Sequence, residues 1–261
     1  MSEKTFEITF LGTCACDFSE RLNTDLKNTL DKDVRRSSSA LIDGKILIDC
    51  GPHTLNSLDI LNIPYSNITD ILITHLHDDH FNPEAISKIA KDRHTPLRLW
   101  VREDATLDEI SGVELVRMTP YEKYPLNEAT AVTGLVANHD VDAFPHHFLI
   151  ERNGKRLLYA CDGAWLLNKT YYHLHNAHLS IAVLDCTSGD YEGDYRAGEH
   201  NSIPMLRVML PALKTFGVID DKTKIYFSHL APSLHKPHEE TEKIAHTLGA
   251  FVAYDGLCIE A

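Results

Sequence analysis

The sequence contains no run of about 18 consecutive apolar residues, so it predicts no membrane-spanning helix. It also has no linker rich in proline, glycine or serine and no low-complexity tract, which favours one domain over residues 1–261. The opening segment MSEKTFEITF is charged and alternates like a strand, unlike a signal or transit peptide. These absences predict a cytoplasmic protein without a membrane anchor.

Cysteines are few, and their positions do not suggest a disulfide framework. The chain has 6 of them, and four lie inside or at the end of apolar segments, as small buried residues do: Cys50, Cys161, Cys186 and Cys258. Free, buried thiols are typical of a reducing compartment, which agrees with the expected cytoplasmic location.

Basic side chains are outnumbered by acidic ones. The chain has 25 Lys and Arg against 38 Asp and Glu, a formal net charge of −13. This negative field repels phosphate backbones and disfavours a protein that binds nucleic acid polymers. A small anionic substrate stays compatible with it, because a bound metal ion can reverse the local charge.

Two hairpins and several strand–helix alternations predict an α/β architecture. The dipeptides Asp43-Gly44 and Asn153-Gly154 each stand between apolar segments and favour type I′ turns. The first hairpin is followed by Asp49-Cys50-Gly51 and the second by Cys161-Asp162-Gly163, an echo that suggests two similar halves. We expect helices over 52–61, 83–91, 203–217 (with Pro211 kinking or breaking it) and 237–249, and strands over 71–74, 181–185 and 224–228.

The residues after the predicted strand 71–74 carry the strongest chemical signal. They read His75-Leu76-His77-Asp78-Asp79-His80, so three imidazoles and two carboxylates leave one strand together. Imidazole and carboxylate are ligands for zinc, manganese or iron, and this spacing lets one loop reach two metal positions. The alternative, a solvated polar loop, does not account for the H-x-H-x-D-H order.

One loop cannot complete two metal sites, so further ligands must come from other strand ends. His139 follows LVAN, Asp162 follows LLYAC and His229 follows IYFS, each at the end of an apolar segment. Taken singly, each of these residues is better explained as a hydrogen-bonded polar group at a strand end. Taken together with the first loop, they are candidate ligands.

These residues and their order resemble the metallo-β-lactamase superfamily over nearly the whole chain. The resemblance implies a four-layered αββα sandwich of two similar halves with a dinuclear metal site at the shared edge. It implies one metal on His75, His77 and His139, a second on Asp79, His80 and His229, and Asp162 as the bridge. Manganese or zinc is favoured as the two divalent ions, and iron is also compatible. In this superfamily an aspartate at the position of Asp162 is typical of phosphoesterases, where the best-known zinc β-lactamases carry cysteine.

A narrower resemblance concerns one branch of the superfamily. The segments FLGTCAC, SSSALIDGKILIDCG, LDCTSGD, GEHNSIPM and GAFVAYDGLCIEA are similar to the branch that includes the cyclic-phosphate phosphodiesterase of phosphonate breakdown. The resemblance implies that His200 contacts the scissile phosphate, as a catalytic and substrate-binding residue. The implied substrate is a small, cyclic or nucleotide-derived phosphodiester. The alternative is a polar loop before a helix, because Asn201 and Ser202 are good helix caps.

Three other polar residues are weaker candidates. Asp78 adjoins the ligands without being one by pattern, and we expect it to orient a histidine or the bridging water as a catalytic residue. His147, in FPHHF near the third ligand, and His235, six residues after His229, are candidates for substrate binding. A role as ordinary loop or strand histidines is the alternative for both.

Two other functions stay open at the level of sequence. The same metal ligands would serve a hydrolase of a thioester, lactone or β-lactam carbonyl, or a non-catalytic metal-dependent binding protein. Asp162 and His200 favour phosphodiester hydrolysis over the first, and the complete set of seven ligand positions favours an enzyme over the second. The physiological substrate, the native metal and the choice between a monomer and a homodimer are not fixed by the sequence.

Overall fold

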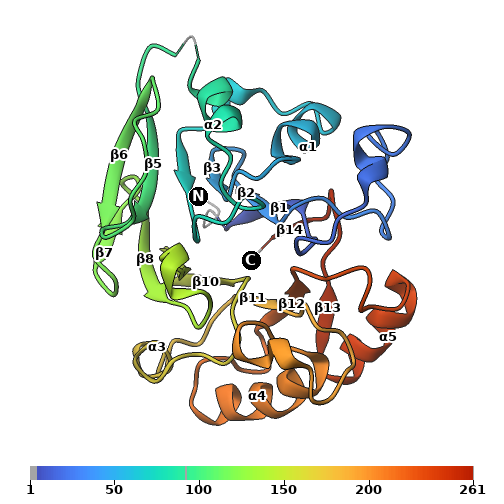
Figure 1. Cartoon of the computed structure of the whole chain (residues 1–261). Coiled ribbons are helices and arrows are strands. Elements are labelled where there is room, and N and C mark those ends of the chain that lie inside the picture. Colours follow the sequence, from blue (N-terminus) through green and yellow to red (C-terminus); the bar gives the residue numbers. More distant parts are fainter. Residues whose placement is uncertain (1–4, 92, 261) are drawn as a thin grey trace.

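The computed structural model describes residues 5–91 and 93–260. It consists of two seven-stranded mixed sheets that face each other, with helices on their outer faces (Figure 1). This is the four-layered αββα sandwich predicted from the sequence.

The first sheet is formed by the N-terminal half of the chain and the last strand. Its strand order is β14-β1-β2-β3-β4-β5-β6. The strands are β1 (Glu7–Gly12), β2 (Ser39–Ile42), β3 (Ile46–Ile48), β4 (Asp70–Leu72), β5 (Leu97–Arg102), β6 (Val113–Met118) and β14 (Cys258–Glu260). Helices α1 (Thr54–Ile60) and α2 (Pro83–Ala90) and the 3₁₀ helices η1 (Glu20–Asn23) and η2 (Tyr65–Asn67) belong to this half.

The second sheet repeats this arrangement, with the order β13-β12-β11-β10-β9-β8-β7. Its strands are β7 (Lys123–Pro125), β8 (Thr130–Val136), β9 (His146–Arg152), β10 (Lys155–Ala160), β11 (Ile181–Asp185), β12 (Lys224–Ser228) and β13 (Ala250–Val252). The helices of this half are α3 (Asn168–His173), α4 (Ile203–Thr215), α5 (His238–Thr247) and the 3₁₀ helices η3 (Val141–Ala143) and η4 (Tyr195–Gly198).

The two sheets have the same pairing sequence. In each, an antiparallel meander (β1-β2-β3 or β8-β9-β10) is followed by three parallel strands (β4-β5-β6 or β11-β12-β13). Each is also extended by one antiparallel strand, β14 or β7. The echo between Asp49-Cys50-Gly51 and Cys161-Asp162-Gly163 therefore marks equivalent positions in two similar halves.

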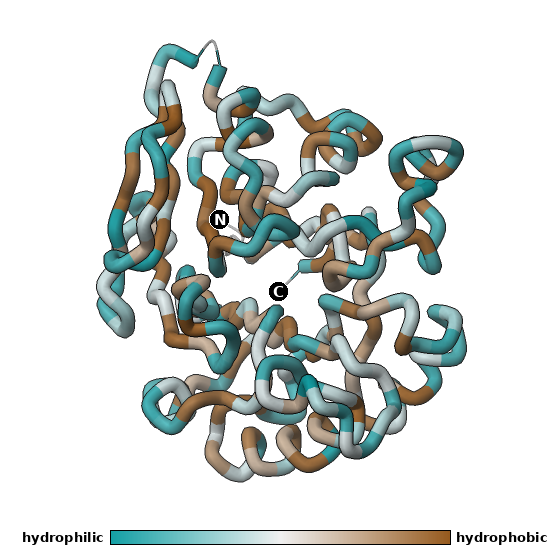
Figure 2. Tube along the Cα trace, viewed as in Figure 1, coloured by the Kyte–Doolittle hydropathy of each residue, from teal (hydrophilic) through white to brown (hydrophobic). Residues whose placement is uncertain are grey.

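Side chains that point alternately to the two faces of each strand explain the four layers. In β2, Ala40 and Ile42 join the core between the sheets, whereas Leu41 packs on the outer side with α1 and α2. In β11, Ile181 and Val183 face the first sheet. Side chains point alternately to the two faces of a strand, so strands buried on both faces need apolar residues at every position. Figure 2 shows this apolar content recurring along the strands and at intervals on the outer helices.

Both predicted hairpin turns are confirmed. Asp43 and Gly44 have φ values of 51° and 64°, and Asn153 and Gly154 have 48° and 77°. Positive φ at both central residues is the mark of a type I′ turn. Helix α2 also begins as predicted, because the Asn82 side chain accepts a hydrogen bond from Ala85 N at 3.0 Å.

Two local expectations differ from the structure. Helix α4 is not broken at Pro211, because Pro211 lies on its exposed face while Leu206, Met209 and Leu213 anchor the opposite face in the core. The backbone bond that proline removes is thus lost on the solvent side. Cys258 is exposed, because it lies on the edge strand β14 with its neighbour Ile259 turned inward. No helix among the described residues is long and apolar enough to cross a membrane.

Candidate metal centre

The candidate metal centre lies where loops leave the ends of strands from both sheets. The first sheet contributes the loop 75–80 after β4. The second contributes His139 after β8, Asp162 after β10 and His229 after β12. All seven predicted ligands come together in two groups whose donor atoms lie within 4.8 Å of one another.

The backbone at this edge is held in uncommon conformations. Asp49, Asp162 and His229 all have positive φ, between 58° and 59°. Such values are rare outside glycine and cluster at functional sites, where the surrounding structure enforces them. The first of these turns packs directly on the ligand loop, since a Cβ on Gly51 would lie 1.9 Å from the Asp79 carbonyl oxygen.

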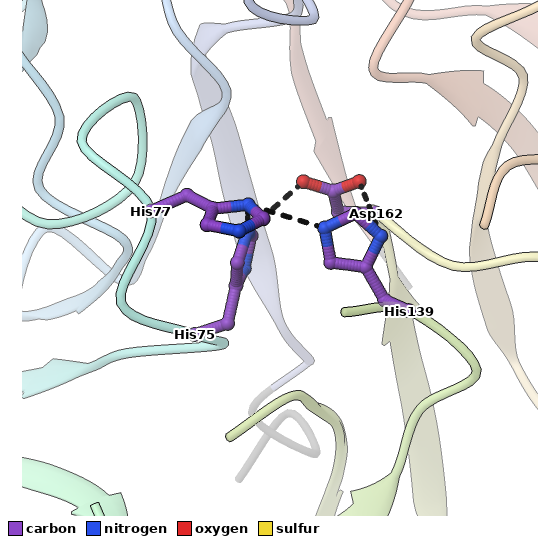
Figure 3. Close-up of side chains that lie close together, drawn as sticks. All are labelled: His75, His77, His139 and Asp162. Atoms are coloured by element: carbon purple, nitrogen blue, oxygen red, sulfur yellow. Dashed lines mark hydrogen bonds and ion pairs between the residues drawn. The ribbon is translucent and has the colours of Figure 1, made fainter. Parts of the chain in front are cut away.

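Figure 3 shows the first group, His75, His77, His139 and Asp162, pointing toward one point. His77 Nδ1 lies 3.0 Å from His75 Nε2 and 3.2 Å from His139 Nε2. Asp162 Oδ2 lies 3.1 Å from His75 Nε2. Burial lowers the pKa of His75 to about 3, so this imidazole is neutral and can act as a ligand.

The second group shares Asp162 with the first and adds Asp79, His80 and His229. Asp162 Oδ2 is 3.2 Å from His80 Nε2 and 3.4 Å from His229 Nε2. His80 Nε2 is also 3.3 Å from an Asp79 oxygen. A single carboxylate oxygen therefore lies between the two groups, the position that a bridging ligand needs.

The hydrogen bonds on the outer side of these rings determine which nitrogens are free. His80 Nδ1 donates to Asp49 at 2.8 Å, and His229 Nδ1 lies 2.8 Å from Thr187 Oγ1 and 3.2 Å from Asp185 Oδ2. With its proton on Nδ1, each ring can turn the Nε2 lone pair toward a cation. The two Nε2 atoms nevertheless face each other at 3.3 Å, where they cannot hydrogen-bond. Convergent lone pairs beside a carboxylate fit a divalent cation, so the residues present suit the metals that the sequence predicts.

Sequence reasoning missed these outer carboxylates. Asp49 and Asp185 are fully buried, and Asp140 holds His77 Nε2 at 3.2 Å. The available signal was position: Asp49 follows β3 and Asp185 ends β11, both at the edge where the ligands gather. A buried aspartate at such a strand end needs a partner, and here the partner is a ligand histidine.

Asp49→Asn is expected to weaken metal binding about 10–100-fold without removing a ligand. The asparagine oxygen can still accept from Thr74 N, now 2.7 Å from Asp49 Oδ1, but its NH₂ group cannot accept the His80 Nδ1 proton. Competition with a chromophoric zinc chelator measures the change. Asp59→Asn, which alters an exposed carboxylate bonded to Tyr65, is the matched control. Equal zinc affinities for Asp49→Asn and the unmodified protein would contradict this role.

His200 lies at the same centre, next to the shared aspartate. Its Nδ1 is 3.1 Å from Asp162 Oδ1 and 3.4 Å from Asp185 Oδ2. Burial opposes a charge on this ring, but the hydrogen bonds to Asp162 and Asp185 outweigh it and raise its pKa to about 11. Ser202, not His200, caps helix α4 by accepting from Met205 N at 3.4 Å. The predicted polar loop before a helix is thus present, and it also carries His200 into the centre.

Three other predicted residues are placed differently. His147 is enclosed by protein, with 1% of its surface exposed, so it cannot touch substrate as predicted. Its ring packs against Gly163 behind the centre. His235 donates from Nε2 to the Cys186 carbonyl at 2.6 Å and is outside the cavity lining. Asp78 lines the cavity but, within 5–91 and 93–260, makes no hydrogen bond to a predicted ligand, so it does not orient a ligand histidine in this way.

A cavity of about 500 Å³ opens above the centre. Its lining includes five of the predicted ligand residues: His77, Asp79, His139, Asp162 and His229. Its walls add polar groups from two loops of opposite halves, among them Cys16, Asp17, Arg196 and Glu199. This volume is within the range of small-molecule sites.

Comparison with solved structures identifies the fold. The chain is similar to the metallo-β-lactamase fold protein YhfI from Bacillus subtilis, at a TM-score of 0.75 and 14% identity over 99% of this chain and 100% of that one. It is similar to a diphosphatase of the PhnP family, at 0.73 and 19% over 99% and 98%. It is also similar to Zn²⁺-bound PqqB from Methylobacterium extorquens, at 0.73 and 16% over 98% and 100%. The chain therefore has the metallo-β-lactamase fold.

Sequence comparison adds one partial match. The family model described as anti-Pycsar protein Apyc1 matches residues 28–110, which include the histidine-rich loop but not His139, Asp162 or His229. No curated protein matches the chain significantly.

Proposed function

We propose that this protein is a dinuclear metal-dependent hydrolase of small phosphodiesters. The observation that carries the proposal is the position of Asp162 Oδ2, within 3.1–3.4 Å of histidine nitrogens from both groups. In that position Asp162 would serve as a ligand to both ions, the arrangement found in two-metal phosphoesterase sites.

The ligands would be His75, His77 and His139 for one ion, Asp79, His80 and His229 for the other, and Asp162 for both. Two bound ions supply the Lewis acidity that activates water and neutralises charge on phosphate oxygens. The chain's own contribution is positioning: Asp49, Asp140 and Asp185 fix the ring orientations.

His200 is the residue that favours hydrolysis of a phosphodiester over hydrolysis of a carbonyl substrate. Its ring lines the cavity, and the carboxylates of Asp162 and Asp185, 3.1 and 3.4 Å from Nδ1, favour the protonated form of the ring. An imidazolium there can donate a hydrogen bond to a phosphate oxygen and a proton to a departing alkoxide. The leaving group of a phosphodiester needs that proton, because alkoxides are strongly basic.

The substrate class follows from size and charge. A cavity of about 500 Å³ takes a nucleotide-sized molecule rather than a polymer, and the net charge of −13 repels nucleic acids. The partial match to the anti-Pycsar Apyc1 family is a reason to begin with cyclic nucleotides.

The test is reconstitution of metal-free protein. After chelation and loading with Mn²⁺ or Zn²⁺, elemental analysis is expected to find two ions per chain. Only the loaded protein should hydrolyse bis(p-nitrophenyl) phosphate and cyclic nucleotides. One ion or fewer per fully loaded chain would contradict the dinuclear site. Turnover of a thioester or nitrocefin without turnover of any diester would favour the carbonyl alternative, and binding of metal without any turnover would favour a binding protein.

Cys161→Ala is the matched control for the ligand assignment. Cys161 precedes Asp162, yet its side chain is buried in the core between the sheets. The variant is expected to keep two ions, because all proposed ligands are nitrogen or oxygen. A loss of one ion in this variant would place a thiolate at the centre.

A further inference from the structure

The cavity wall contains one strongly basic group. Among the described residues that line the cavity, Arg196 is the one arginine or lysine. Apart from the proposed ligands and His200, the charged residues around it are acidic: Asp17, Asp78 and Glu199. The outer part of the cavity is therefore negative, apart from the metals, with a single guanidinium in its wall.

Arg196 is held rigidly. Its Nε and Nη2 donate to the two oxygens of Asp194 at 2.8 and 2.7 Å, a bidentate pair. The guanidinium carbon also lies 5.2 Å from the centre of the Tyr195 ring. A bidentate pair fixes the plane of the guanidinium group, so its remaining donors have a defined direction. In the part of the chain that the structure describes, Nη1 has no hydrogen-bond partner, and 28% of the side chain is exposed.

The same short segment links Arg196 to the centre. His200 N donates to the Arg196 carbonyl at 2.8 Å, at the end of η4. Both residues line the same cavity, so a molecule whose phosphate lies beside His200 can contact Arg196 with its organic part.

From this arrangement we infer that Arg196 binds a neutral hydrogen-bond acceptor on the organic part of the substrate, such as a nucleobase carbonyl. This inference rests on the proposed function. Asp194 cancels the charge of Arg196 but leaves its Nη1 donor free. The neighbouring Asp17, Asp78 and Glu199 repel a second anionic group. The cavity thus selects a diester with a single negative charge and an uncharged, acceptor-bearing substituent.

Three substrates with one leaving group test this inference. They are methyl p-nitrophenyl phosphate, the p-nitrophenyl ester of thymidine 5′-monophosphate, and the 3′-phosphorylated form of that ester. In Mn²⁺-loaded protein, Arg196→Gln is expected to raise KM for the thymidine ester at least about tenfold, the typical effect of a lost hydrogen bond to a charged donor. KM for the methyl ester should change less than about threefold, because that substrate is too small to reach Arg196. The added 3′-phosphate should raise KM in the unmodified protein.

Two control variants separate the donor from its charge. Asp194→Asn combined with Arg196→Gln keeps the net charge of the pair and should show the same loss for the thymidine ester. Arg207→Gln, at an exposed position on α4 outside the cavity lining, should leave all three KM values unchanged. Restoration of KM in the double variant would mean that charge, not hydrogen bonding, is the cause.

Failure of this inference differs from failure of the proposed function. Equal KM changes for the methyl and thymidine esters would overturn the inference, and so would a 3′-phosphate that lowers KM through Arg196. If the protein hydrolyses none of the esters, calorimetry with the methyl ester of thymidine 5′-monophosphate decides. If the unmodified protein binds this ester and Arg196→Gln weakens the binding at least about tenfold, the inference is supported and the proposed hydrolytic function is rejected. No binding, or binding that the variant leaves unchanged, overturns the inference.

Discussion

Asp162→Ala is expected to reduce hydrolysis of any diester to the background rate and to reduce metal content below two ions per chain. Oδ2 of Asp162 is the one oxygen within 3.1–3.4 Å of His75, His80 and His229 nitrogens, so its loss removes the common ligand of both groups. The loss in kcat should exceed the roughly 10–100-fold cost of an outer carboxylate such as Asp49.

The fold of this variant should survive. The cores between and outside the sheets are built from apolar side chains, and Asp162 lies at their edge. Circular dichroism and the melting temperature of the metal-free protein should therefore stay close to those of the unmodified protein. The stabilisation that metal adds to the unmodified protein should be lost, because a ligand stabilises a fold only in proportion to its binding. Two ions and near-normal turnover in Asp162→Ala would show that another residue bridges the groups.

The parts of the fold that the sequence predicts are those determined by the conformational preferences of a few adjacent residues. Asp43-Gly44 and Asn153-Gly154 determine their turns because few residues tolerate positive φ at two successive positions. Asn82 and Pro83 determine a helix start for a similar reason. The histidine-rich loop is recognisable because its ligands are close in sequence. The pairing of the two halves rests on a resemblance, and the order of strands in each sheet confirms it.

The parts that the sequence does not predict depend on contacts between distant segments. Asp49 and His80 are 31 residues apart, and only the folded structure shows that they share a hydrogen bond. His147 is a candidate because it is close in sequence to the proposed ligand His139, yet its position at the start of β9 turns it into the protein interior. Pro211 is tolerated because the packed face of α4 outweighs one lost backbone bond on the exposed face. The sequence does not indicate a binding role for Arg196. That role becomes visible only in the folded structure, which shows the pair with Asp194 and the cavity that both His200 and Arg196 line.

His200→Ala is expected to lower kcat for diester hydrolysis by roughly 10²–10⁴, the usual contribution of a general acid. Metal content should stay at two ions, since the proposed ligand sets are complete without this ring. The structure makes this a demanding test, because His200 Nδ1 is 3.1 Å from Asp162 and belongs to a third His/Asp group at the centre. A lost ion in the variant would assign His200 to the metal rather than to the substrate.

The leaving group separates the two roles that His200 can have toward a phosphate. If the imidazolium protonates the departing oxygen, the loss in His200→Ala should be large for an alkyl leaving group and small for p-nitrophenolate, which departs without a proton. If the ring only stabilises charge on the phosphate, both substrates should lose rate equally, because the same oxygens carry the charge in each reaction. His200→Gln, which can donate a hydrogen bond but not a proton, should recover rate in the second case and not in the first. Unchanged rates for both substrates in both variants would reduce His200 to a residue of the loop before α4 and would remove the main reason to prefer phosphorus over a carbonyl carbon.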